Sequence, residues 1–402
     1  MPPRSLLFRN LGILASATLL ALFGVVTFDY LRASEGLIDA SGHVVGWDFM
    51  VFHSSGVLAE QGRLADLFDQ DRFHASTEEL FAHELPLKPR IWPYPPPMLL
   101  VTVPFGRLPY LWSLTAWSAI FLAAYLMATR RIVLLAAPAT MANLLFGQTG
   151  FLVGALFFWA FRVLRHRPVL AGMLLGMVVV KPHLGLMVPL ALLAARAWRA
   201  FLGAALTLGA LALLSGLMFG WDAWRLWIQE VLSHQVSVLH MGEGGDILLS
   251  VWQGATYLGA PAGVAWAVQG LGTTTAVVAT WWAFSRLRRG SIAPARAFSI
   301  LVLATCMATP YIFNYDWTLL APVAVYGLAW WRRKDWTRTG MGLADVAECS
   351  LWLAIWMLPV LWLLPYPLAP SLAAVAVPAA LALMVRGAAR EGGKPMPASC
   401  AG

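Results

Sequence analysis

Long apolar runs separated by short polar segments dominate the chain and predict transmembrane helices. A straight helix needs about 20 apolar residues to cross the ~30 Å hydrocarbon core of a bilayer. The runs at 168–181 and 184–195 are too short for this and predict a helical hairpin, a broken helix or a re-entrant pair. The full set lies at about residues 10–29, 109–129, 132–147, 149–164, 168–181, 184–195, 200–219, 262–284, 292–309, 317–331, 349–364 and 368–385. The pattern therefore predicts an all-α polytopic membrane protein, a bundle of about 10–12 transmembrane helices.

The spacing of these runs predicts one membrane domain over residues 1–385, followed by a disordered cytoplasmic tail at 386–402. Two longer polar stretches, at about 30–97 and 220–257, predict loops on the outer side. A simple pore or anchor has no need of such loops, whereas a membrane enzyme that works at the outer surface does.

The first of these loops contains two predicted helices. The segment Trp47–Glu60 carries Phe and Met residues that suit an amphipathic helix lying on the membrane surface. A second helical stretch follows at Asp71–Glu84. The prolines of Ile91–Pro97 (IWPYPPP) forbid a regular helix and favour an extended backbone.

The second loop carries tryptophans at Trp221, Trp224 and Trp227. Tryptophan is enriched at membrane–water interfaces, and a repeat of three residues suits a helix. We therefore expect an interfacial helix at the start of this loop.

Composition and charge support the membrane assignment and orient it. Hydrophobic residues make up 59% and charged residues 12% of the chain, about half the charged share of soluble proteins. Under the predicted topology 16 of the 20 acidic residues lie outside or at the outer ends of spans. Twenty of the 28 Lys and Arg residues fall in clusters on the other side: Arg4 and Arg9; Arg130 and Arg131; Arg162, Arg165 and Arg167; Arg196 and Arg199; Arg286, Arg288, Arg289 and Arg296; Arg332, Arg333, Lys334 and Arg338; Arg386, Arg390 and Lys394.

The positive-inside rule makes the basic side the cytoplasm, with both termini inside. The formal net charge of +8 follows this topology. It does not indicate nucleic-acid binding, because no basic patch carries the necessary aromatic spacing. Arginine far outnumbers lysine and Ala, Gly and Trp are abundant, as in GC-rich bacterial genomes, so we expect a bacterial cytoplasmic (inner) membrane.

Asp48 is the first candidate for chemistry, because it follows the first predicted span and lies beside the membrane plane. A carboxylate there can act as general base toward a sugar hydroxyl. Aspartate is also a favoured N-cap residue, so Asp48 could instead cap the helix that follows it. Both interpretations fit the sequence.

Cations and polar residues between the apolar runs are candidates for binding. Lys181 and His183 interrupt two runs, and ionisable groups at such depth are usually functional. Lys181 could hold a lipid-linked phosphate or snorkel to the interface. Arg90, before the proline run, suits bidentate phosphate recognition or an interface anchor. The same alternatives apply to Arg107 and Arg225.

Two polar residues lie at the ends of spans, and the first loop carries histidines. Gln148 breaks two runs and could contact a sugar or form a turn; Asp316 lies at the outer mouth of a span. His53, His74 and His83 lack metal-ligand spacing, so we predict no metal site, although divalent metal dependence stays open. The chain has no P-loop and no G-x-G-x-x-G, which argues against nucleotide-driven transport.

Five segments in order resemble glycosyltransferase family 87 of the GT-C membrane glycosyltransferases. They cover about residues 46–326 and read GWDFMVFHSSGVLAEQGRLADLFD, WPYPPPMLLVTVPFGRLP, FGQTGFLVGALFF, AGMLLGMVVVKPHLGLMVPLALLAARAWRAF and TPYIFNYDWTLLAPV. The family includes polyprenyl-phosphate-mannose-dependent α-mannosyltransferases. The resemblance implies a GT-C-type bundle and a sugar on polyprenyl phosphate as donor.

The resemblance also implies roles for single residues. Asp48 matches the acidic residue of the first outer loop and becomes the predicted catalytic base. Tyr94 lies in the matched Tyr-Pro-Pro element and Lys181 and His183 in the Lys-Pro-His element. Asp316 matches an acidic position beside the late Pro-Tyr motif. His53 stands where many relatives carry Tyr or another aromatic residue, which suggests an effect on acceptor choice.

The sequence thus predicts an inverting transfer of a sugar, mannose or another hexose or pentose, to a lipid or glycan acceptor at the outer face of the membrane. Asp48 is the base. The phosphate-binding candidates are Lys181, Arg90 and His183, in that order, and the acceptor or sugar contacts are His53, Tyr94, Gln148 and Asp316. No cofactor and no nucleic acid is expected. A secondary transporter and a lipid-handling envelope protein are the alternatives.

Overall fold

The computed structural model describes residues 21, 24, 37–38, 42–81, 87–88, 90–231, 245–332, 342–363 and 368–391. Over these ranges the chain forms helices and no β-strand beyond two isolated bridges. The prediction of an all-α polytopic membrane protein is confirmed. The first predicted span, at 10–29, falls almost wholly outside the described residues.

Five helices of the described part are long and apolar enough to cross a membrane. They are α6 (Tyr110–Thr129), α11 (Trp198–Phe219), α15 (Ala262–Arg288), α19 (Leu343–Met357) with its extension η8 (Leu358–Leu363), and α20 (Leu368–Glu391). Each coincides with a predicted run. Large apolar side chains on α6, α11 and α15 are exposed, which suits contact with lipid.

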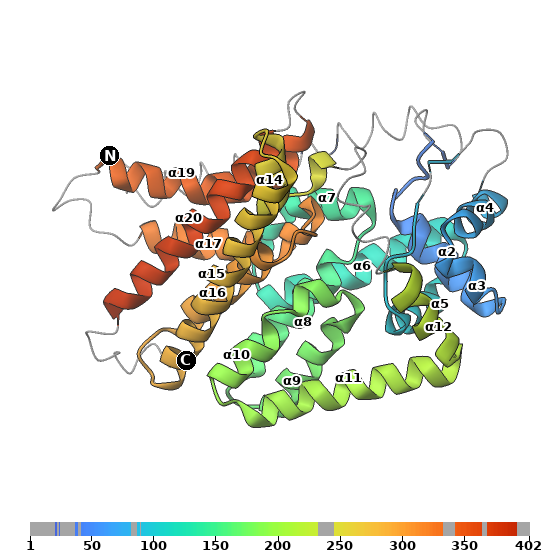
Figure 1. Cartoon of the computed structure of the whole chain (residues 1–402), viewed down its shortest axis with the longest axis horizontal. Coiled ribbons are helices and arrows are strands. Elements are labelled where there is room, and N and C mark those ends of the chain that lie inside the picture. Colours follow the sequence, from blue (N-terminus) through green and yellow to red (C-terminus); the bar gives the residue numbers. More distant parts are fainter. Residues whose placement is uncertain are drawn as a thin grey trace.

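Shorter helices fill the bundle between these spans. They are α8 (Gly150–Val163), α9 (Pro168–Gly176), α16 (Pro294–Ala308), α17 (Leu320–Arg332) and α14 (Val251–Tyr257). Figure 1 shows α15, α16 and α20 side by side, with α11 along the lower edge of the molecule, and α15 packs on α16. The helix α16 is buried along almost its whole length and forms the centre of the core.

Two predicted helical runs are broken at prolines. The run at 132–147 was predicted as one span, which is wrong. It splits at Pro138 into η2 (Ile132–Ala136) and α7 (Pro138–Phe146). Proline lacks the N–H that would continue the first helix, but it fits the first position of a new one.

The two short runs do not continue as one broken helix. The chain reverses at Lys181, as in the predicted helical hairpin or re-entrant pair, because Gly172 and Gly176 of the first run lie against Ala200 and Ala204, which follow the second run. The first is α9 with η3 (Met177–Val180), and the second is η4 (Pro182–Gly185) with α10 (Val188–Ala194). Lys181 lies at the break with φ −140° and ψ 74°. A residue before proline is disfavoured in the helical region, so Pro182 explains why the helix stops there.

The apolar side chains of the helix α2 (Phe49–Glu60) face the protein interior and are not available to a membrane surface, so that part of the prediction is wrong. Nearly all of its residues are buried. It packs on α5 (Leu99–Gly106) through Gly56, where a Cβ would come 2.5 Å from the Thr102 carbonyl oxygen. Its polar residues His53, Ser54 and Ser55 are buried together with its apolar ones, so α2 is an interior helix of this part of the molecule.

The loop helices form a separate unit at the right of Figure 1. Besides α2 and α5 it contains α3 (Leu64–Phe68), α4 (Gln70–Phe81) and α12 (Trp221–Leu226), and these elements share one apolar cluster. The predicted helix over Asp71–Glu84 is observed as α4. The predicted tryptophan helix is α12, and the indole of Trp227 just after it donates to the Pro93 carbonyl oxygen at 3.3 Å.

The predicted disordered tail is wrong for its first residues. The last helix α20 continues to Glu391, so residues 386–391 are helical. Ala388 is fully buried, and Gly387 lies against the Arg296 side chain, so packing holds this end of the helix. Residues 392–402 lie outside the described part.

Candidate functional site

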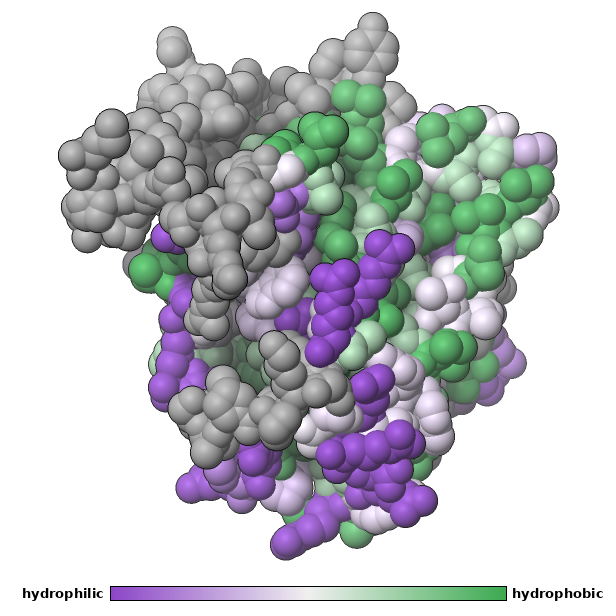
Figure 2. Space-filling model, turned by 90° about the vertical axis from the view of Figure 1, so that its left-hand side faces the viewer, coloured by the Kyte–Doolittle hydropathy of each residue, from purple (hydrophilic) through white to green (hydrophobic). Residues whose placement is uncertain are grey.

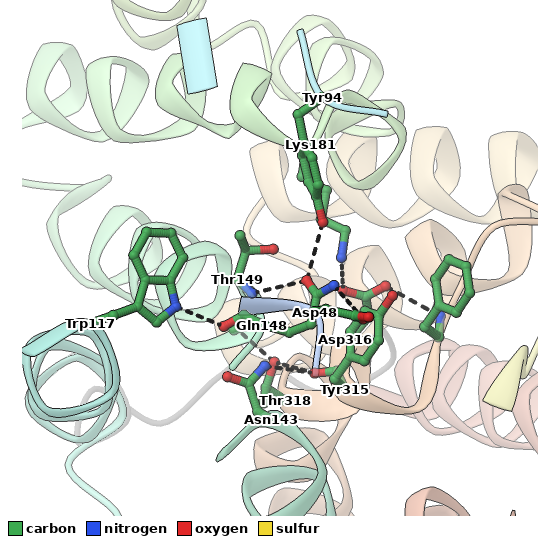
Figure 3. Close-up of polar contacts among 12 residues, drawn as sticks. Asp48, Tyr94, Trp117, Asn143, Gln148, Thr149, Lys181, Tyr315, Asp316 and Thr318 are labelled. Carbon is green, nitrogen blue, oxygen red and sulfur yellow. Dashed lines mark hydrogen bonds and ion pairs between the residues drawn. The ribbon is translucent and has the colours of Figure 1, made fainter. Parts of the chain in front are cut away.

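Four loops meet inside the molecule and bring polar side chains together (Figure 3). Asp48 precedes α2, Gln148 joins α7 to α8, Lys181 joins η3 to η4, and Asp316 lies in η7 (Asn314–Thr318) before α17. Tyr94 reaches the same place from the extended proline segment. Asp48, Gln148 and Lys181 stand at helix boundaries, where the backbone can turn a side chain into a shared space.

Glycines bring the first two loops into contact. Gly46 has φ +85° and the next residue, Trp47, has φ +41°. Gly147 has φ +58°, and a Cβ there would lie 2.5 Å from the Cβ of Phe49. A side chain at Gly147 would both strain the backbone and push the loops apart. The close approach places Gln148 beside Asp48.

The Asp48 side chain does not cap α2, although Asp48 stands at the N-cap position. Its Oδ2 accepts a hydrogen bond from Nε2 of Gln148 at 2.9 Å. Its Oδ1 lies 3.7 Å from Nε of Arg90, and the side chains are 16% and 30% exposed. The capping interpretation is therefore not what the structure shows. Asp48 is held by a side chain 100 residues away and remains reachable.

The amide of Gln148 is oriented by neighbours on its oxygen side. The Tyr94 hydroxyl donates to Oε1 at 3.1 Å, and the Thr149 backbone N–H donates to the same atom at 3.2 Å. Burial, with the negative charges of Asp48 and Asp316, raises the pKa of Tyr94 well above its ordinary value, so the phenol stays protonated. With Oε1 occupied, the amide NH₂ faces Asp48. This series of hydrogen bonds fixes Oδ2 of Asp48.

Lys181 and Asp316 form a buried ion pair within the cluster. Nζ of Lys181 lies 2.6 Å from Oδ1 of Asp316, and the side chains are 3% and 0% exposed. The backbone N–H of Phe313 donates to the other oxygen of Asp316 at 3.2 Å. Nζ also lies 4.7 Å from the centre of the Tyr315 ring. Lys181 neither snorkels to an interface nor stands free for an anion, because Asp316 already neutralises it.

The two histidines among the candidates lie differently. His183 is half-buried, and its Nε2 has no hydrogen-bond partner among the described residues. His53 donates from Nε2 to the Leu108 carbonyl oxygen at 3.0 Å and packs against the rings of Phe81 and Tyr110. Burial lowers the pKa of His53, while the bond to Leu108 opposes that shift. His53 thus belongs to an aromatic cluster, and the structure does not bring it into the polar one.

Two further arginines of the sequence analysis form exposed pairs away from this cluster. Nε of Arg107 lies 2.5 Å from Glu60, and Nε of Arg225 lies 3.1 Å from Asp222. Within the described ranges no three His, Cys, Asp or Glu side chains come close enough to hold a metal ion.

Sequence reasoning missed two aromatic residues of the cluster. Trp117 donates from its indole to the Gln148 carbonyl oxygen at 3.5 Å, and Tyr315 lies under Lys181. The sequence could have pointed to Tyr315, because it is next to the candidate Asp316 in the segment TPYIFNYDW. Nothing in the sequence distinguishes Trp117, because it lies inside an apolar run among other aromatic residues.

Comparison with known proteins identifies the family of this chain. No curated protein and no solved structure matches it. A family model for glycosyltransferase family 87 matches residues 92–310, more than half of the 402 residues. The match contains Tyr94, Gln148, Lys181 and His183 and decides against the transporter and lipid-handling alternatives. The chain belongs to glycosyltransferase family 87 and is a membrane glycosyltransferase.

Proposed function

We propose that this transferase moves a sugar, mannose or another hexose or pentose, from a polyprenyl-phosphate donor to a lipid or glycan acceptor. Asp48 is the general base. The observation that carries the proposal concerns the Asp48 carboxylate: it does not cap α2, Gln148 holds one of its oxygens, and the side chain is partly exposed. A base needs this combination of fixed direction and access.

The transfer step uses only groups present in this cluster and the two substrates. Oδ1 of Asp48 takes the proton of the acceptor hydroxyl while that oxygen attacks the anomeric carbon. The bond from the anomeric carbon to the phosphate oxygen breaks, and polyprenyl phosphate leaves with the electron pair. Attack from the opposite side inverts the anomeric centre. A β-linked donor would give an α-glycoside.

Arg90 is the best-placed cation for the leaving phosphate. It is more exposed than Lys181, and its only described anionic partner is Asp48, at 3.7 Å. The donor phosphodiester carries one negative charge, as a carboxylate does, and gains further negative charge as the bond to the sugar breaks; its oxygens accept two parallel bonds from a guanidinium. The developing charge would therefore draw Arg90 toward the phosphate while Asp48 accepts the proton. The phosphate-binding order becomes Arg90, then His183, then Lys181.

The remaining residues support this geometry. Lys181 and Asp316 form a rigid, buried support beneath the site. Their positive and negative charges orient the polar groups around them. Tyr94 and Gln148 position Asp48. His53, a residue of α2 that packs against Phe81 and Tyr110, would act on the acceptor only through that packing.

The membrane orientation belongs to the same proposal. The positive-inside rule places the arginine clusters in the cytoplasm and the unit of α2, α3, α4, α5 and α12 outside the bacterial cytoplasmic membrane. A lipid-linked donor suits this location, because its lipid tail keeps the sugar in the membrane, where the sugar can reach the outer face.

The test is transfer by the purified protein in lipid, with radiolabelled polyprenyl-phosphate-mannose and a crude membrane-lipid acceptor pool. Asp48→Asn keeps the size of the side chain but removes the base, so we expect turnover to fall by about 10²–10⁴-fold. Asp71→Asn makes the same change on the exposed surface of α4 and should keep full activity. Other polyprenyl-phosphate sugars are then tried in place of mannose.

Each outcome decides something. A labelled product that Asp48→Asn still forms at the wild-type rate would exclude Asp48 as the base. If the folded protein forms no labelled product with any of the polyprenyl-phosphate sugars, this donor class is excluded.

A further inference from the structure

A hollow opens on the flank of the bundle between α10 and α15. Its volume is about 520 Å³, which falls within the range of roughly 300–1,000 Å³ for small-ligand pockets. Leu190, Val277, Val278 and Trp281 form its apolar wall, and Arg286 and Arg289 stand at one end. An apolar wall that ends in two cations matches a molecule with a chain and an anionic head.

The arginine end has unused hydrogen-bonding capacity. The guanidinium of Arg286 lies over the Trp282 ring at 5.0 Å, and its buried Nε has no hydrogen-bond partner in the described part of the chain. Neither Arg286 nor Arg289 forms an ion pair with a described carboxylate. Arginines at a helix C-terminus also favour the helix dipole. The helix dipole explains why cations lie at this end of α15, but it explains neither the hollow nor the Nε–H of Arg286, which lacks a described partner.

The part of α15 that lines the hollow has a length close to the thickness of one leaflet of a bilayer. The twelve residue-to-residue steps from Val277 to Arg289 rise by about 18 Å at ~1.5 Å per step, somewhat more than half of the ~30 Å hydrocarbon core. Figure 1 places the turn from α15 to α16 at the lower left, away from α2 at the right. Figure 2 views the molecule from that left side and shows hydrophilic side chains gathered toward the bottom, with hydrophobic ones at the upper right.

From these observations we infer a binding site for one anionic glycerophospholipid between α10 and α15. The headgroup phosphate lies against Arg286 and Arg289, and an acyl chain runs along the apolar wall toward Val277. The site is distinct from the Asp48 cluster and does not depend on the sugar that the enzyme transfers.

The experiment is native mass spectrometry of the purified protein titrated with phosphatidylglycerol, or with phosphatidylcholine of the same acyl chains. Arg286→Gln/Arg289→Gln removes the cationic end, and Val277→Trp fills the chain end without a change of charge. Arg288→Gln/Arg390→Gln is the matched control, since both arginines are exposed and do not line the hollow. Thermal unfolding without added lipid checks that each variant is folded.

We expect the wild type and the control to retain one phosphatidylglycerol in preference to phosphatidylcholine. Loss of both arginines should weaken this binding about 30-fold, at ~1 kcal/mol for each cation near a phosphate, and Val277→Trp should abolish it. Equal weakening in the control would mean general attraction to charge and would overturn the site. Unchanged binding in Val277→Trp would also overturn it.

Discussion

Two carboxylate–cation pairs lie in one cluster and differ in access. Lys181 and Asp316 are 2.6 Å apart and almost fully buried, whereas Arg90 and Asp48 are 3.7 Å apart and partly exposed. Burial makes the first pair dependent on both partners, because a lone charge in the interior is costly. The second pair exchanges with solvent or substrate at little cost. The comparison separates the frame of the site from the groups that can react.

The largest effect is expected when the buried pair is broken. Lys181→Met leaves Asp316 as an uncompensated buried charge and should cost about 3–5 kcal/mol of stability. The measurement is thermal unfolding of the purified protein in detergent. Lys181→Met/Asp316→Asn removes both charges and keeps an oxygen for the Phe313 N–H, so it should regain much of the loss. A double variant as unstable as the single one would contradict the assignment of the cost to charge.

An intermediate effect is expected when the open pair is broken. Arg90→Gln should raise KM for the polyprenyl-phosphate donor about tenfold, as for one lost charge-assisted contact of ~1.4 kcal/mol. Stability should stay near wild type, because a partly exposed pair contributes only about 0–1 kcal/mol. Arg107→Gln breaks the exposed pair with Glu60 and serves as the control. A loss of stability with KM unchanged would mean that Arg90 stabilises the fold of the site and does not bind the donor phosphate.

The smallest effect tests a buried ionisable group that has no charged partner assigned to it. The pKa of His53 is lowered by burial, so below about pH 6.5 the unfolded chain binds a proton that the folded chain resists. Stability should therefore fall as the pH drops below that value, by less than about 1.4 kcal/mol per pH unit. His53→Gln keeps a donor for Leu108 and should flatten this slope in thermal unfolding. The half-exposed His74→Gln is the control, and an equal flattening there would remove His53 as the cause.

Prediction from sequence worked best where a property repeats along the chain. The run at 109–129 became α6 and the run at 200–219 became α11, since a long apolar run has one way to satisfy its backbone in lipid. It failed for α2, because the same apolar residues suit a membrane surface or a protein interior. It also failed at 132–147, where one proline outweighed the hydropathy of the run.

The sequence by itself determined the class of this protein and the inventory of its polar candidates. Hydropathy, charge and the ordered motifs identify a polytopic glycosyltransferase, and they pick out Asp48, Gln148 and Lys181 as unusual. Only the tertiary structure decided which of these meet. Asp48 contacts Gln148 across 100 residues, and Lys181 contacts Asp316 across 135. The contact of Asp48 with Gln148 depends on the close approach of separate loops at Gly46 and Gly147, which no local periodicity encodes.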